Sequence, residues 1–264
     1  MKGIITRADD YGSSHAANIA IAEAAKAGFI KNVSIMACGP FLEEAAELLA
    51  FDKNICFGLH SCINAEWDRV IWGPVAPREW VSSLIDHRNA FFQNPVQYAE
   101  CKPNIEEIIT EYQYQLERVR KAGFDIKYMD SHMLPERHIP GLQQEISKLI
   151  ETEGLIDHMW FNQILKGDEL ALGSIEHFTS ALIKIENQVL LILHPARYGE
   201  EMCKTGNKDI SGETIARNRE KDYQIAINKD ILKMCEKNGI RLLRYDEAEK
   251  MDKPYEIKWV SLGG

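Results

Sequence analysis

The sequence predicts an α/β protein built as a (β/α) barrel, TIM-like and either distorted or incompletely closed. Short, wholly apolar segments alternate with longer amphipathic segments along the 264-residue chain. Strands without polar alternation are typical of parallel sheets that are covered on both faces. The length suits a barrel. A doubly wound open sheet is the alternative, although the chain has no Gly-rich dinucleotide fingerprint and no P-loop.

The elements of the first half follow from local signals. Residues 3–8 form an apolar run that predicts a strand. Residues 15–27 are expected to be helical, because Ser13 or Ser14 can cap the start and Gly28 can end the helix. A strand at 32–37, an Ala-, Leu- and Glu-rich helix at 41–50 and a strand at 55–59 come next. A long helix at 104–122 ends at Gly123, and a strand at 126–130 follows.

The second half repeats the alternation. A helix at 141–153 ends at Gly154, and a short strand is expected at 158–161. A helix at 174–185 precedes an apolar strand at 189–193. The last helix, at 214–237, is stopped by Asn238 and Gly239, and a strand at 240–245 completes the sheet. We therefore expect a single domain over residues 1–264 with one loop insertion at about 64–104. This Trp- and Pro-rich insertion is either the wall of a pocket or a set of surface loops with packing aromatics.

Composition excludes some classes of partner. The net charge is −9 and no basic patch is visible, which argues against nucleic acid. No apolar run approaches membrane-spanning length, so we expect no membrane partner. The chain shows no signal-peptide pattern, and we expect a cytoplasmic protein. Its six cysteines contain no C-x-x-C pair, which predicts reduced thiols. A homodimer is the candidate assembly.

Polar side chains follow several of the predicted strands at their C-terminal ends. The carboxylates Asp9 and Asp10 end the first strand, and His60, His132 and His194 follow three others. Two adjacent carboxylates at the end of a buried strand are costly unless they serve a site. Because the C-terminal ends of parallel strands converge on one face of a barrel, we expect these residues to share that site.

Three of these residues have the donor chemistry of a catalytic metal site. Asp10, His60 and His132 offer one oxygen and two nitrogens, which leaves open positions for water and substrate. This donor set suits Zn²⁺, Co²⁺ or Mn²⁺ better than Mg²⁺, although Mg²⁺ remains a candidate. Asp130, two residues before His132, is expected to lie behind the ligands and to bond a ligand imidazole.

The remaining two residues are candidates for proton transfer. Asp9 is the candidate general base, because a carboxylate beside the metal can accept the proton of an attacking water. Gly12 permits the turn that could bring Asp9 and Asp10 to the same rim. His194 is the candidate general acid or oxyanion stabiliser, and a fourth metal ligand is its competing role.

With these residues named, the chain resembles the YdjC-like family of carbohydrate deacetylases. Five motifs occur in the family's order and cover nearly the whole chain. They are Ala8-Asp9-Asp10-Tyr11-Gly12, Gly58-Leu59-His60, Asp130-Ser131-His132, His194-Pro195-Ala196 and Arg219-Glu220-Lys221-Asp222. Each motif alone is weak, but five in order are a strong signal.

The resemblance implies a (β/α) barrel with one divalent cation held by Asp10, His60 and His132. It also implies hydrolysis of the acetamido group of a small carbohydrate such as a chitooligosaccharide, phosphorylated or not. We further expect Tyr11, Asn64 and Arg219 to bind the substrate.

The chain departs from the family pattern beside the site. The family usually continues D-S-H-H-x-x-H, whereas Met133 follows His132 here and His138 is the candidate replacement for a lost histidine. Arg7 stands where the family commonly has Asn, and Ser61 and Cys62 follow the third strand in place of an apolar residue. These changes bear on sugar specificity and on activity.

Two other functions remain open from the sequence. A metal-dependent phosphoesterase on a similar barrel usually needs more ligands than this chain offers. A catalytically altered member that only binds sugar or metal would not need the base, so the presence of Asp9 favours the enzyme.

Overall fold

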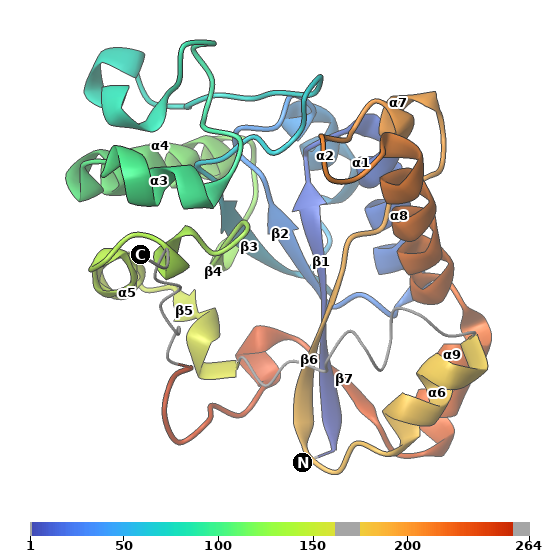
Figure 1. Cartoon of the computed structure of the whole chain (residues 1–264). Coiled ribbons are helices and arrows are strands. Elements are labelled where there is room, and N and C mark those ends of the chain that lie inside the picture. Colours follow the sequence, from blue (N-terminus) through green and yellow to red (C-terminus); the bar gives the residue numbers. More distant parts are fainter. Residues whose placement is uncertain (1, 162–174, 256–264) are drawn as a thin grey trace.

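The computed structural model describes residues 2–161 and 175–255, in which seven strands form one parallel sheet (Figure 1). The strand order is β5-β4-β3-β2-β1-β6, and β7 also pairs with β1. The strands are β1 (Gly3–Tyr11), β2 (Asn32–Ile35), β3 (Cys56–Ser61), β4 (Ile126–Ser131), β5 (Ile156–Asp157), β6 (Gln188–Leu193) and β7 (Arg241–Leu243). Every strand pair is parallel, as the apolar runs predict.

Strand β1 is the branch point of the sheet. It pairs with β6 along one side, while its other side pairs first with β7 and then with β2. The buried side chain of Asn32 joins the branches. Its Nδ2 donates to the carbonyls of Thr6 (3.0 Å) and Leu243 (2.9 Å), and its Oδ1 accepts from the Tyr245 amide (2.8 Å). The sheet curls into an incompletely closed (β/α) barrel, which confirms the predicted fold class.

Helices cover the convex side of the curled sheet. They are α1 (His15–Ala27), α2 (Leu42–Leu49), α3 (Pro95–Cys101), α4 (Ile105–Lys121), α5 (Leu142–Thr152), α6 (Ile175–Ile183), α7 (Glu200–Cys203), α8 (Gly212–Ala226) and α9 (Lys229–Lys237). Figure 1 shows α3 to α5 on one side of the strands and α1, α2 and α6 to α9 on the other. None of the helices in the described ranges has the length and apolar character needed to cross a bilayer.

The two faces of the sheet bury two separate apolar clusters. Alternate residues of a strand point to opposite faces. Ile4 and Ala8 therefore belong to the large cluster that includes the helices, whereas Ile5 belongs to a smaller cluster with Leu190 and Leu243. The smaller cluster fills the concave interior of the barrel, below the polar residues at the carboxyl ends of the strands.

Two predicted elements are wrong. Residues 158–161 form the short 3₁₀ helix η4 (His158–Phe161) instead of a strand, because Asp157 Oδ1 accepts from the Met159 amide and turns the chain directly after β5. The single helix predicted at 214–237 is two helices, α8 and α9. Asn228 separates them, since its side chain accepts from the Asp230 and Ile231 amides and caps α9.

The other predicted elements are present with ends shifted by a few residues. The first residue of the helix predicted at 174–185, Ser174, lies outside the described residues. The predicted insertion is not wholly irregular, because it contains α3 and the 3₁₀ helices η1 (Arg78–Trp80) and η2 (Ser82–Leu84).

Candidate metal centre

Strand alternation brings polar side chains together at the carboxyl end of the concave face. Asp9, His60 and Asp130 lie on β1, β3 and β4 at this level, and all three are buried. Asp10 would point to the opposite face in a regular strand. Its φ of 68° is in the left-handed region, which costs a non-glycine residue about 1–2 kcal/mol. Gly12 also has a positive φ, but the turn begins at Asp10 itself.

Asp10, His60 and His132 converge on one point. Asp10 Oδ1 lies 3.5 Å from His60 Nε2 and 3.5 Å from His132 Nδ1, and the two nitrogens are 3.1 Å apart. The three residues are 2%, 2% and 5% exposed, and Asp10 Oδ1 has no hydrogen-bond partner. Ligands about 2.1 Å from a metal ion lie roughly 3.0–3.4 Å from one another. The residues present therefore fit a divalent cation.

Each imidazole of the cluster is held by a carboxylate on its other nitrogen. His60 Nδ1 makes a short hydrogen bond with Asp130 Oδ1, and Asp130 Oδ2 accepts from Ser34 Oγ at 2.6 Å. His132 Nε2 lies 3.1 Å from Glu66 Oε2. Such partners fix the ring orientation and leave the facing nitrogen as the ligand atom. Burial opposes protonation of His60, but the carboxylates of Asp130 and Asp9 outweigh it and raise its pKa to about 10.

Arg7 is the buried counter-ion of the acidic side chains. Its Nε and Nη2 each donate to one oxygen of Asp9 at 2.7 Å, and its Nη1 lies 3.2 Å from Asp130 Oδ2. Burial disfavours the charged form, but these two carboxylates raise the pKa of Arg7 well above its ordinary value. Asp9, His60 and Asp130 also lie close enough to form a second group of donor atoms. Both oxygens of Asp9 accept from Arg7, whereas Asp10 Oδ1 has no hydrogen-bond partner, so the cluster with Asp10 is the better cation site.

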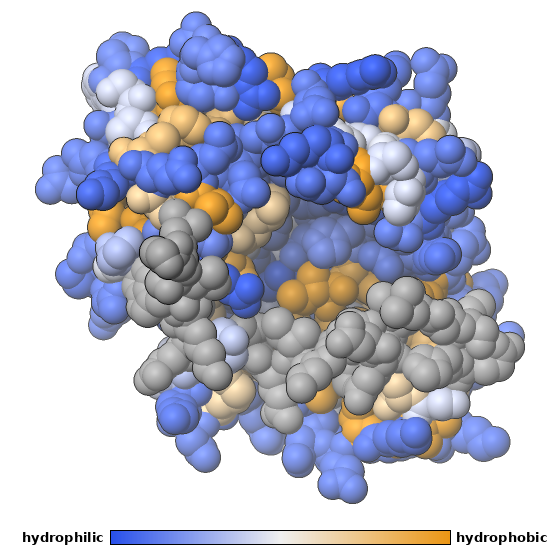
Figure 2. All heavy atoms as spheres, viewed as in Figure 1, coloured by the Kyte–Doolittle hydropathy of each residue, from blue (hydrophilic) through white to orange (hydrophobic). Residues whose placement is uncertain are grey.

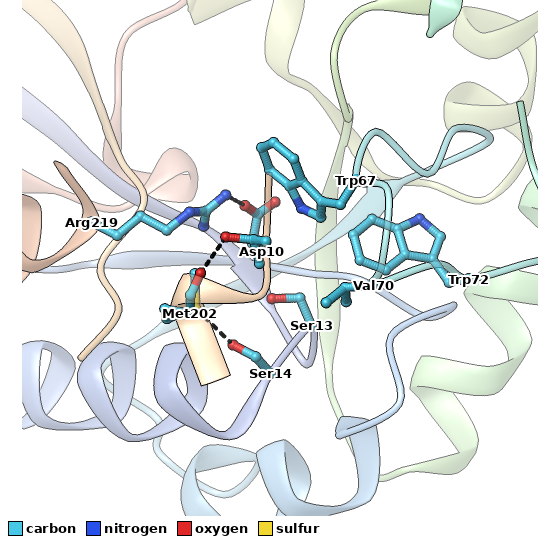
Figure 3. A pocket seen from close by; sticks show the side chains of 9 residues that line it. Asp10, Ser13, Ser14, Trp67, Val70, Trp72, Met202 and Arg219 are labelled. Carbon is cyan, nitrogen blue, oxygen red and sulfur yellow. Dashed lines mark hydrogen bonds and ion pairs between the residues drawn. The ribbon is translucent and has the colours of Figure 1, made fainter. Parts of the chain in front are cut away.

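Helix α8 supplies the partner of Asp10. Arg219 Nη2 lies 2.7 Å from Asp10 Oδ2 (Figure 3). Burial raises the pKa of Asp10, but Arg219 and the two histidines outweigh it and hold the pKa well below its usual range. Arg219 thus orients this carboxylate so that Oδ1 faces the imidazoles.

His194 follows β6 and lies beside the same helix. Its backbone amide donates to Asp222 Oδ2 at 2.8 Å. A cavity of about 240 Å³ opens there. Its lining residues are His194, Ile215, Asn218, Arg219 and Asp222. The last four lie on one face of α8, at the i, i+3, i+4 and i+7 spacing. In the part of the chain that the structure describes, His194 does not belong to the cluster of candidate ligands.

A smaller cavity of about 20 Å³ reaches Asp10 from the insertion side (Figure 3). Its lining residues are Asp10, Ser13, Ser14, Trp67, Val70, Trp72, Met202, Thr205 and Arg219. Arg219 lines both cavities. Figure 2 shows this face of the molecule hollowed near its centre, between α3 to α5 on one side and α7 and α8 on the other. The start of the insertion is therefore a pocket wall, one of its two predicted roles.

Residues 3–156 match the sequence model described as YdjC-like protein. The chain belongs to the YdjC-like family. Two relatives are both called carbohydrate deacetylase. The protein from Thermoanaerobacter pseudethanolicus is 24% identical over 93% of this chain and 98% of its own length. The protein from Enterococcus faecalis is 30% identical over 93% of this chain and 97% of its own length. The resemblance inferred from the five motifs is confirmed.

Solved structures agree on the fold. An Enterococcus faecalis protein, assigned provisionally to cellobiose-phosphate cleavage, has a TM-score of 0.75 at 21% identity, over 93% of this chain and 98% of that one. The catalytic domain of a peptidoglycan N-acetylglucosamine deacetylase from Eubacterium rectale has a TM-score of 0.55 at 11% identity, over 97% of this chain and 94% of that one. At these identities the likeness extends to the fold alone.

Two of the residues expected to bind substrate are buried in this YdjC-like chain. Tyr11 is fully buried, and its hydroxyl donates to the carbonyl of Ala45 in α2 at 2.8 Å. Asn64 is also buried. Its Nδ2 lies 3.4 Å from Glu66 Oε2, the oxygen that faces His132. The third, Arg219, lines both of the cavities described above, and its guanidinium is bound to Asp10.

His138 does not replace the lost histidine at the cluster, whose described members are Asp10, His60 and His132. Glu136 lies nearer the strand end, where Ser131 Oγ donates to its carboxyl group. Burial raises the pKa of Glu136 to about 7.

Sequence reasoning missed Glu66 and the structural role of Arg7. Nothing in the pattern around Glu66 distinguishes it from a solvated acidic residue of a loop. Arg7 was visible as a departure from the family motif. A buried arginine two residues before a carboxylate of the same strand face would have been a usable signal.

Proposed function

We propose that this YdjC-like protein is a metal-dependent hydrolase that removes the N-acetyl group from an amino sugar of the chitooligosaccharide type. The observation that carries the proposal is the convergence of Asp10 Oδ1, His60 Nε2 and His132 Nδ1, with the carboxylate oxygen unpartnered. The names of the relatives from Thermoanaerobacter pseudethanolicus and Enterococcus faecalis support the substrate class.

Asp10, His60 and His132 would hold the cation. Two imidazoles and one carboxylate favour Zn²⁺, Co²⁺ or Mn²⁺ over Mg²⁺. When bound, a divalent cation here would polarise the amide carbonyl and acidify a nearby water. The carboxylates Asp130 and Glu66 keep the two ligand rings in place.

Asp9 is the proposed base. A carboxylate has about four lone-pair sites, and Arg7 occupies two of them, one on each oxygen. The remaining sites can accept a proton from water as its oxygen attacks the amide carbon. Arg7 holds the carboxylate in one orientation, which limits the reorganisation needed for proton transfer.

His194 is the proposed acid. As the C–N bond breaks, the leaving nitrogen needs a proton, and the products are acetate and a free amine. The cavity of about 240 Å³ beside His194 has room for a sugar ring. Asn218 and Asp222 offer polar atoms to hydroxyl groups there, and Ile215 offers an apolar surface.

The test is release of acetate from N-acetylglucosamine, N,N′-diacetylchitobiose and their phosphorylated forms. The protein is stripped with a chelator and reconstituted with Zn²⁺, Co²⁺, Mn²⁺ or Mg²⁺. We expect acetate release that requires the cation and stops in Asp9→Asn. Cation binding without release from any substrate would favour the altered, binding-only member, and hydrolysis of an aryl phosphate would favour the phosphoesterase.

A further inference from the structure

Glu66 connects the insertion to a candidate metal ligand. It follows β3 by five residues, and its side chain is 8% exposed. Glu66 Oε2 lies 3.1 Å from Nε2 of His132. The other ring nitrogen of His132, Nδ1, faces Asp10.

The backbone of Glu66 is held from two sides. Its carbonyl accepts from Gln93 Nε2 at 3.2 Å, within the insertion, and from Asn207 Nδ2 at 3.1 Å, in the segment before α8. A second hydrogen bond joins the same two segments, because the Asp68 amide donates to the Gly206 carbonyl at 2.8 Å. Two segments about 140 residues apart in the sequence therefore meet at Glu66.

We propose that Glu66 is the positioning residue of His132 and that it links the order of the insertion to cation affinity. This inference rests on the proposed cation site. For Nδ1 to be a ligand, Nε2 must carry the proton, and a buried N–H needs an acceptor. Glu66 is the acceptor that the structure provides.

The two imidazoles differ in how their acceptors are supported. Asp130, the partner of His60, belongs to β4 and is held by the sheet itself. Glu66 belongs to a loop, and its neighbours Trp67, Val70 and Trp72 line the cavity at Asp10. A displacement of this wall moves the acceptor of His132 but leaves the acceptor of His60 in place.

The test compares Glu66→Gln and Glu66→Leu with the wild type. Glutamine keeps an acceptor oxygen without the charge, and leucine keeps the approximate volume without any acceptor. We expect Zn²⁺ affinity, measured by competition with a chromophoric chelator, to fall in the order wild type, Glu66→Gln, Glu66→Leu. Loss of a partner behind a ligand typically costs on the order of 10- to 100-fold in affinity.

A second readout is independent of activity. In the Zn²⁺-loaded wild type, NMR should show a downfield His132 Nε2–H proton protected from exchange, which His132→Ala identifies by its absence. We expect this signal to exchange faster in Glu66→Gln and to be lost in Glu66→Leu.

The matched control is Asp68→Asn. Asp68 lies on the same loop and accepts from Gln93, but the structure gives it no contact with His132. Its Zn²⁺ affinity and the protected proton should stay as in the wild type. Thermal denaturation identifies a variant that fails to fold. If Glu66→Leu fails to fold, the comparison of Glu66→Gln with the wild type tests the inference.

Equal Zn²⁺ affinity and equal proton protection in the wild type and both Glu66 variants would overturn the inference. If the wild type itself bound no Zn²⁺, Co²⁺, Mn²⁺ or Mg²⁺, the proposed cation site would fail instead. The two failures are therefore distinguishable.

Discussion

Arg219 on α8 binds Asp10 at the end of β1, with Nη2 2.7 Å from Oδ2. The contact uses one carboxylate oxygen and leaves Oδ1 facing His60 and His132. It joins residues 209 positions apart in the sequence, and Arg219 lines both the small cavity that reaches Asp10 and the larger cavity beside His194. The guanidinium of Arg219 thus compensates the charge of the buried Asp10 carboxylate and orients its free oxygen, Oδ1, toward the two imidazoles.

Arg219→Met should destabilise the cation-free protein by about 3 kcal/mol, because the buried Asp10 loses its counter-ion. Added Zn²⁺ should restore much of that loss, since a dication replaces the missing charge. Thermal denaturation with and without Zn²⁺ measures this. The gain in stability on adding Zn²⁺ should be larger for Arg219→Met than for the wild type. Arg217→Met, at an exposed position of the same helix, is the control. An equal gain in Arg219→Met and the wild type would contradict the prediction.

Cation binding should depend on Asp10, His60 and His132 together. His60→Ala or His132→Ala removes one of three ligands, so metal content by mass spectrometry should fall to near background. His138→Ala is the control and should keep the wild-type content, because His138 is not in the cluster. Full occupancy in His132→Ala, with loss in His138→Ala, would reassign the ligand.

Asp9→Asn should keep the cation and lose turnover. The amide is isosteric, but it cannot accept the proton from water, and loss of a general base typically costs on the order of 10²- to 10⁴-fold in rate. Acetate release and metal content are measured on the same sample. If Asp9→Asn lost the cation while Asp10→Asn retained it, the two carboxylates would have the opposite roles.

His194→Ala should lower kcat by on the order of 10²-fold while cation affinity stays unchanged. The residue lies in the cavity beside α8 and outside the described ligand cluster. Acetate release and chelator competition are the two measurements. A crystal structure with a His194 nitrogen about 2.0–2.2 Å from the ion would make it a ligand and exclude the acid role.

Glu136 should make the protein less stable as pH rises. Its pKa is about 7 in the folded chain, above the ordinary value near 4.5, because the carboxyl group is buried. The folded state then binds more protons than the unfolded state between these values, so stability falls across that interval by up to about 3 kcal/mol.

Glu136→Gln should remove this component, and urea denaturation from pH 5 to pH 8 measures it. The variant should gain stability relative to the wild type as pH rises. The exposed Glu151→Gln on α5 serves as the control and should follow the wild type. Parallel profiles for Glu136→Gln and the wild type would show that Glu136 does not titrate as described.

Local patterns determined the order of strands and helices and the edge of the sheet where the candidate ligands lie. The ends of β3 and β4 were visible as apolar runs followed by His60 and His132, and parallel strands bring such ends to one edge. The split at Asn228 has a local signal, the capping preference of asparagine, but the helical periodicity on both sides of it predicts one continuous helix.

The sequence already indicated Asp130 as a partner of a candidate ligand imidazole, but the tertiary structure alone decided that Glu66 and Arg219 hold the other candidate ligands. Glu66 approaches His132 from 66 positions away, and Arg219 approaches Asp10 from 209. Asn32 joins the branched strands through contacts about 210 positions away in the sequence. Periodicity and capping describe a chain only over a few turns. A contact between distant segments depends on how the sheet curls and where its loops return, which no local pattern encodes.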